Sequence, residues 1–259
     1  MIQWSRKFPY CRAIEDANSL SGGTEIWYGD VPYYVKLVGI PGTLAGDILR
    51  LKSDLDFSEE VAKLPLIAFD PEKHFKKSTT YKQEIRYLLQ CRGSPRIVQL
   101  LGRTEEGALV FPKFKRSFME TLLSNKDQGR MQNIRRWMVV VIDGVACLHS
   151  LGIIHRDLNI LESDPLVICD LQCLHSTYHC QPFEIDGGDY GNFSFASDVF
   201  ALGALLWESC FYNAPYSRDI LLDNPPPPPF RDIFVACTQE KPEDRSTLTQ
   251  LRVMYEAIR

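Results

Sequence analysis

The spacing of apolar and polar positions changes near residue 112, and this change divides the chain into two parts. Before it, short runs rich in β-branched and aromatic residues alternate with turn residues, a pattern typical of strands. After it, apolar residues recur at helical spacing over longer runs, as in a helix packed among other helices. The pattern therefore predicts an α+β fold with a sheet-rich first part and a helical second part.

The predicted elements follow from these periods and from their flanking residues. Thr80 and Gln83 have the spacing of a capping box, so a helix is expected to begin there. Strands are predicted at Glu25–Tyr28, Tyr33–Val38, Leu64–Phe69, Ile97–Leu101 and Ala108–Phe111, and helices at Leu44–Asp54, Thr79–Cys91, Phe118–Leu123, Ile134–Ser150, Ser197–Phe211 and Thr247–Ile258.

The proline run Pro225–Pro229 cannot be helical or lie in a central strand. A stiff surface connector is favoured over a motif for a proline-binding partner. The interval from Asp198 to Arg245 is short, so the proline run is expected to replace a helix there.

The composition of the chain limits the classes of molecule that it is expected to bind. A net charge of −4 gives no basic footprint for nucleic acid, and no apolar run is long enough for a membrane span, so a cytoplasmic protein is expected. The lysines at 73, 76 and 77 are interpreted as solvated surface. The eight cysteines are expected to be free thiols, because their spacing lacks a paired zinc knuckle.

Several motifs occur in one order along the second half of the chain. "CLHSLGIIHRDL" (147–158) is followed by "VICDLQ" (167–172), "SDVFALGALLWES" (197–209) and "KPEDRSTLTQL" (241–251), and "EIRYLLQCRGSPRIVQLLG" (84–102) precedes them all. This ordered set resembles the eukaryotic protein kinase family over roughly residues 20–259. The resemblance implies a two-lobed kinase-like fold, with an N-terminal lobe over 1–112, a C-terminal lobe over 113–259, and a hinge near Phe111–Lys115.

The resemblance also implies roles for individual residues in phosphoryl transfer, which depends on positioning and charge stabilisation. Asp157 is the expected catalytic acceptor for the hydroxyl proton. Asn159 and Asp170 are the expected ligands of Mg²⁺, which prefers such oxygens. Glu184 is expected to pair with Arg245. ATP and Mg²⁺ are therefore the expected cofactors, and a protein substrate or signalling partner is expected.

The catalytic loop departs from the family pattern, because Asn159 follows Asp157 after two residues instead of five. Two residues span about 7 Å, but positions i and i+2 of an extended chain face the same way, so both side chains can share a cleft. The shortened segment lacks the cation that the family places near the transferred phosphate, a loss of about 10²–10³ in rate. Gln172 replaces the flexible glycine of the family.

The phosphate-binding lysine is less clearly marked. In the favoured reading, Gly22 and Gly23 belong to a shortened glycine-rich loop, and Lys36 pairs with Glu84, which makes residues 40–78 an insertion. In the rival reading, Leu64–Pro71 corresponds to the strand that carries the phosphate-binding lysine in the family. Phe69 then occupies the position of that lysine, and the chain has no phosphate-binding lysine.

The leading hypothesis is a protein kinase that transfers the γ-phosphate of ATP to a protein hydroxyl. The first alternative is a pseudokinase that acts as a binding or scaffolding module, because the loop is short. The second alternative is a small-molecule phosphotransferase of the aminoglycoside type, which the segments at 197–209 and 241–251 disfavour.

Overall fold

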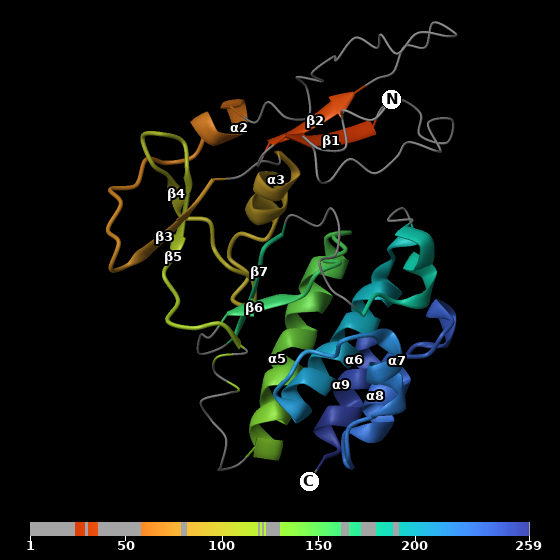
Figure 1. Cartoon of the computed structure of the whole chain (residues 1–259). Helices are drawn as coiled ribbons and strands as arrows, with labels where there is room; N and C mark the ends of the chain where they lie inside the picture. The colour runs from red at the N-terminus through yellow and green to blue at the C-terminus, as the bar shows by residue number, and fades with distance from the viewer. Residues whose placement is uncertain are drawn as a thin grey trace, which may run out of the picture.

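The structure is a computed structural model that describes residues 24–28, 31–35, 58–78, 82–118, 120, 122, 130–161, 166–171, 180–188 and 192–258. The predicted helix at Leu44–Asp54, together with Gly22, Gly23 and Lys36, lies outside the described residues. Strands β1 to β5 and the helices α2 and α3 occupy one side of the molecule, and α5 to α9 occupy the other (Figure 1). The α+β class predicted from the apolar pattern is therefore confirmed, whereas the lobe boundary at residue 112 stays a prediction.

A three-stranded antiparallel sheet forms the first part, in the order β3 (His74–Lys77), β5 (Leu109–Pro112), β4 (Gly102–Arg103). β5 is central because its "LVFP" run is apolar on both faces, and Leu109 and Val110 are fully buried. The predicted strand at Leu64–Phe69 is reduced to one bridge, between Leu66 and Arg103 at the edge of β4. The predicted strand at Ile97–Leu101 is likewise a single bridge, from Ile97 to Ile168.

A second pair of strands precedes this sheet in the sequence. β1 (Thr24–Tyr28) and β2 (Val31–Val35) pair antiparallel, from Thr24 opposite Val35 to Tyr28 opposite Val31. They match the strands predicted at these positions, although β2 begins two residues earlier than expected, and positions 36–38 of the prediction lie outside the described residues.

Helix α3 (Lys82–Gln90) lies between the sheet and the helical part (Figure 1). Its apolar residues Ile85 and Leu88 are buried, whereas Arg86 and Gln90 on the opposite face are exposed. A short helix, α2 (Ser58–Ala62), contacts it. The turn after α3 contains Gly93 at φ 84°, a left-handed backbone that glycine adopts without strain.

The helical part is built around α5 (Arg130–Ser150) and α6 (Phe195–Phe211), which pack against each other and each contribute a row of buried residues to the core. α6 is buried at nearly every position, as its continuous apolar sequence predicts. α9 (Leu248–Glu256) packs on α5 and begins at the capping box formed by Thr247 and Gln250. None of the helices among the described residues has the length and apolar character needed to cross a membrane.

The segment between α6 and α9 contains two helices that the sequence pattern did not reveal. α7 (Arg218–Asp223) precedes the proline run and α8 (Arg231–Cys237) follows it. The expectation that the prolines replace a helix is therefore wrong. The run is a short connector that turns after Pro227, whose carbonyl accepts from the Phe230 N–H. α8 approaches α6 closely at Gly203, where a Cβ would lie 2.7 Å from Thr238 Cγ2.

Candidate active site

A lysine and two carboxylates meet where the sheet, α3 and the helical part converge. Lys77 is the last residue of β3, Glu84 lies in the first turn of α3, and Asp170 directly follows β7 (Val167–Cys169). Lys77 Nζ donates to Glu84 Oε1 at 2.8 Å and to Asp170 Oδ1 at 2.5 Å. These contacts connect three elements through one ammonium group.

Charge and burial act in opposite directions on this lysine. Burial alone would lower the pKa of Lys77, but the charges and hydrogen bonds of Glu84 and Asp170 outweigh burial and raise it. The side chain of Glu84 is 2% exposed, that of Lys77 24%, and that of Asp170 39%. The ammonium group is therefore held in its charged form beside one buried and one partly open carboxylate.

Lys77 was missed by the sequence analysis, which interpreted it as solvated surface and gave the pairing with Glu84 to Lys36. The interpretation as surface is wrong, because Lys77 forms two ion pairs. The rival reading is also not supported, because Phe69 is 36% exposed and lies near His74, with a ring separation of 6.2 Å. Only four residues separate Lys77, at the end of β3, from α3, which carries Glu84. Because connections between neighbouring elements are usually short, this spacing favours Lys77 over Lys36 as the partner of Glu84.

Asn159 is placed beside Asp170 by strand pairing. β6 (Asn159–Leu161) and β7 pair antiparallel, with Asn159 opposite Cys169, the residue before Asp170. Asp170 has φ 63°, a left-handed conformation that Asp tolerates better than most residues. The Asn159 side chain is exposed, and its Nδ2 donates to the Asp157 carbonyl at 3.0 Å.

Asp157 lies in a loop that a buried carboxylate holds in place. Asp198, in the first turn of α6, is fully buried, and its oxygens accept from the backbone N–H groups of His155 and Arg156, both at 2.8 Å. His149 Nε2 lies 2.9 Å from the same carboxylate. The backbone of Arg156 is left-handed, at φ 72°, so the two hydrogen bonds stabilise a turn that presents the next residue, Asp157.

The loop is also joined to the strand that carries Asp170. His155 is fully buried and its Nε2 lies 2.9 Å from the Cys169 carbonyl. The Arg156 guanidinium lies over the Phe193 ring, 5.4 Å from its centroid. These contacts therefore fix the start of the shortened loop, at His155 and Arg156.

A cavity of about 550 Å³ opens in front of the Lys77 group. Its volume is within the range of small-molecule sites. Apolar side chains such as Leu88, Val98 and Phe111 line it together with charged and polar ones. The lining residues are Phe75, Lys77, Glu84, Leu88, Val98, Phe111, Pro112, Lys113, Phe114, Lys115, Arg116, Ser117, Glu120, Asn159, Leu161, Cys169 and Asp170.

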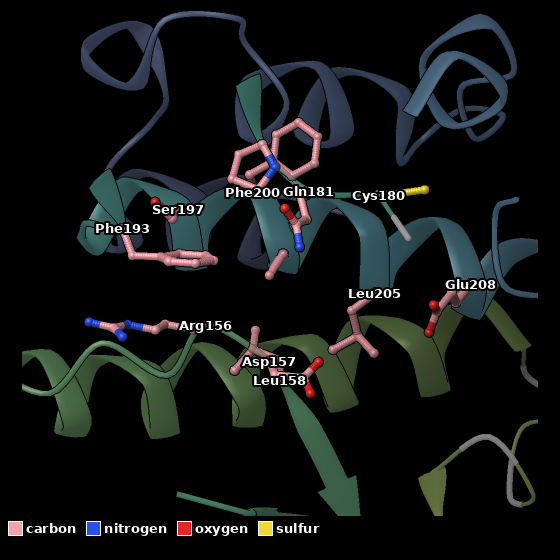
Figure 2. A pocket seen from close by; sticks show the side chains of 12 residues that line it. Arg156, Asp157, Leu158, Cys180, Gln181, Phe193, Ser197, Phe200, Leu205 and Glu208 are labelled. Atoms are coloured by element: carbon pink, nitrogen blue, oxygen red, sulfur yellow. The ribbon is translucent and has the colours of Figure 1, made fainter. Parts of the chain in front are cut away.

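The cavity brings together Glu84, Asn159 and Asp170 from the predicted site, whereas Asp157 lines a neighbouring hollow of about 30 Å³. In Figure 2, Arg156, Asp157 and Leu158 lie on one side of this hollow, and Phe200, Leu205 and Glu208 of α6 lie across it. Cys180 and Gln181 close it from the segment before α6. Asp157 therefore lines a different hollow from Asn159 and Asp170, the expected metal ligands. In the sequence only Leu158 separates Asp157 from Asn159.

The segment beside this hollow is fixed by a buried ion pair. The Arg245 guanidinium donates to both oxygens of Glu184, at 2.7 Å each, and to the carbonyls of Ala196, Gln239 and Glu240. The Arg245 side chain is fully buried. Burial raises the pKa of Glu184, but the hydrogen bonds from Arg245 and Ser197 outweigh it and lower that pKa. The pairing implied by the resemblance is confirmed.

The donor set fits a magnesium ion held against phosphate. Asp170 offers carboxylate oxygens, and Asn159, which pairs with the residue before Asp170, offers an amide oxygen. Both residues line the same cavity as Lys77. Mg²⁺ is usually bound by one or two such protein oxygens together with phosphates and water.

Comparison with known proteins agrees with this arrangement. The model of the protein kinase domain matches residues 66–254, which include Lys77 but not Gly22, Gly23 or Lys36. The chain is also similar to the probable serine/threonine-protein kinase PkwA of Thermomonospora curvata, with 24% identity over 150 residues. That alignment covers 46% of this chain and 20% of PkwA, so the chain matches about a fifth of that relative's length. Because the family model covers most of the sequence, this chain belongs to the protein kinase domain family.

Proposed function

We propose that the chain is an ATP- and Mg²⁺-dependent protein kinase that transfers the γ-phosphate to a protein hydroxyl. The observation that carries this proposal is the Lys77 ammonium, held between Glu84 and Asp170 in a cavity that Asn159 also lines. A cation and two oxygen ligands of the kind that Mg²⁺ prefers therefore line one cavity together with apolar side chains, as a nucleotide with its phosphates requires.

Each residue has a distinct part in the proposed reaction. Lys77 binds the phosphates and keeps its position through Glu84. Asp170 and Asn159 would hold Mg²⁺, which when bound neutralises charge on the β- and γ-phosphates. Asp157 orients the acceptor hydroxyl and accepts its proton from the side of the neighbouring hollow. Asp198 positions Asp157 through the backbone of His155 and Arg156.

The experiment compares phosphate transfer from labelled ATP, to the protein itself and to a mixed protein acceptor, between wild type and single variants. Asp157→Asn and Asp170→Asn are each expected to lower the rate at least about 10²-fold. Asp232→Asn is the matched control, because Asp232 is an exposed aspartate in the first turn of α8. Equal transfer by wild type and Asp157→Asn would refute the proposed role of Asp157.

A second candidate function is a nucleotide-binding scaffold without transfer activity. It is favoured by the short interval from Asp157 to Asn159, which holds only Leu158 and therefore no cation. This candidate predicts that MgATP raises the melting temperature while no variant changes the amount of transferred phosphate. Transfer to an aminoglycoside but not to protein would instead favour the small-molecule class, which the protein kinase family match does not support.

A further inference from the structure

The first residue of α7 holds the segment that closes the smaller hollow, residues 180–183, which we call the closing segment. The Arg218 guanidinium lies 4.0 Å from the centroid of the Phe183 ring, a favourable position for a cation. Its Nη1 also donates to the Gln181 carbonyl at 3.3 Å. One half-buried side chain therefore contacts both the backbone and an aromatic ring of the closing segment.

The loop before α7 makes a further contact with the closing segment. Cys180 Sγ donates to the Pro215 carbonyl at 3.4 Å, and both residues are buried. A thiol is a weak donor, whereas the guanidinium donates as a charged group. Arg218 therefore supplies the stronger of these two connections between the α7 region and the closing segment.

The far end of the closing segment is anchored without Arg218. Glu184, the next residue, accepts two hydrogen bonds from Arg245. The Phe183 ring also meets the Phe200 ring of α6 edge-on, with the centroids 6.4 Å apart. Because these contacts remain when Arg218 is replaced, its loss is expected to loosen the closing segment without unfolding the helical part.

The closing segment and Asp157 line the same hollow from different sides. In Figure 2, Gln181 lies across the hollow from Asp157. The hollow measures about 30 Å³, which is room for little more than a hydroxyl group or a water molecule. In so small a space, moving one wall by about 1 Å changes which groups fit, and a misplacement on that scale can cost about 10²-fold in rate.

The larger cavity is bounded by other parts of the chain. It contains Lys77, Asn159 and Asp170, which lie on or beside β3, β6 and β7. None of the described residues that line it belongs to the closing segment or to α7. A change at Arg218 is therefore expected to leave in place the groups that would bind ATP and Mg²⁺.

We propose that Arg218 is a positioning residue for the acceptor side of the reaction, because it holds the closing segment across the hollow from Asp157. Replacing Arg218 then weakens the use of a protein acceptor but not the binding of ATP. The inference rests on the proposed function for the role of Asp157. It gives α7 a part in acceptor use, although none of its residues lines the larger cavity among those that the structure describes.

The test measures phosphate transfer from labelled ATP to casein, with the concentrations of casein and of ATP varied separately. Arg218→Met is expected to lower kcat/KM for casein at least about tenfold and to keep the KM for ATP within about twofold of wild type. Arg231→Met is the matched control, because Arg231 is an exposed arginine at the first position of α8. It should leave both parameters unchanged.

A double-variant cycle tests whether Arg218 acts through the closing segment. Phe183→Leu removes the ring beneath the guanidinium and keeps an apolar side chain at that position. If Arg218 acts through the closing segment, Arg218→Met/Phe183→Leu should lose less kcat/KM for casein than the product of the two single losses. Independent, multiplying losses would contradict the proposed connection.

Three further results would overturn the inference: wild-type kcat/KM for casein in folded Arg218→Met, a KM for ATP that rises as much as that for casein, or the same loss in Arg231→Met. If circular dichroism shows that Arg218→Met does not fold, Phe183→Leu is measured in its place, and wild-type values for casein then overturn the inference. Where wild type labels only itself, the rate of that labelling at saturating ATP replaces the casein measurement.

The outcome in wild type separates this inference from the proposed function. If wild type transfers phosphate neither to casein nor to itself, the proposed function fails and the positioning role of Arg218 fails with it. If wild type transfers phosphate and Arg218→Met does so equally well at every casein concentration, only the positioning role fails.

Discussion

Replacing Arg245 by methionine is expected to be among the most destabilising single changes in the helical part. The side chain is fully buried, and its guanidinium donates to both Glu184 oxygens and to three backbone carbonyls. Methionine fills similar volume but leaves the Glu184 charge, 12% exposed, without its partner. Removing one member of a buried ion pair costs about 3–5 kcal/mol. The three carbonyls that lose a donor keep the expected loss in the upper part of that range.

The assay is urea denaturation followed by circular dichroism, with the free energy of unfolding extrapolated to water. Arg252→Met is the matched control, because Arg252 is 44% exposed and its ion pairs, with Asp143 and at 3.0 Å with Glu256, are open to solvent, and it is expected to lose no more than about 1 kcal/mol. Arg245→Met/Glu184→Gln should be less destabilised than the sum of the single variants, by about 2 kcal/mol or more. A loss below 1 kcal/mol for Arg245→Met, or strict additivity, would refute the argument.

Three further predictions follow from neighbouring contacts. The pKa of Glu184 is lower in the folded chain than its usual 4.5. The ion pair with Arg245 therefore contributes its full stability above pH 4.5 and loses it as the pH falls through the lower folded value. Between about pH 7 and pH 3 the urea midpoint should fall more steeply in wild type than in Arg245→Met/Glu184→Gln. Asp198→Asn should cost about 2–4 kcal/mol in the same assay and reduce phosphate transfer, because His155 and Arg156 donate to different carboxylate oxygens and the Asn NH2 group that replaces one of them cannot accept; wild-type stability would contradict this. Gly203→Ala should cost about 1–3 kcal/mol, since the new Cβ would lie 2.8 Å from Cys237 Cβ; a more stable variant would contradict the close approach of α6 and α8.

The strongest features of the helical part could be predicted from the sequence because they rest on local signals. The apolar run in α6 and the helical period in α5 predict both helices to within about four residues at each end. Glu184 and Arg245 lie 61 positions apart, so no local signal predicts that they pair. The pairing was expected only from the resemblance to the kinase family. Helix α7 was missed because it has only six residues and lies directly before prolines, which usually mark the absence of a helix.

Lys77 was missed for a different physical reason. In "HFKK" two lysines are adjacent, and successive strand residues face opposite sides, so one must face the cleft and the other solvent. Sequence alone does not say which, because the choice depends on how β3 pairs with β5, where Lys77 lies opposite Leu109. Lys36 attracted attention because its strand has the cleaner apolar pattern. A regular apolar pattern indicates that a segment forms a strand. Which lysine pairs with Glu84 depends instead on which strand lies beside α3.

The shortened catalytic loop illustrates the same distinction between local sequence and strand pairing. Counted along the chain, Asn159 comes three residues too early to act with Asp157 in the family's way. In the structure Asn159 is the first residue of β6, and its register opposite Cys169 fixes its place beside Asp170 whatever the length of the preceding loop. The shortening is therefore absorbed between Asp157 and β6, on the side of the acceptor hydroxyl. For this reason the missing residues should affect the charge available to the transferred phosphate, and hence the rate, more than they affect the binding of metal or nucleotide.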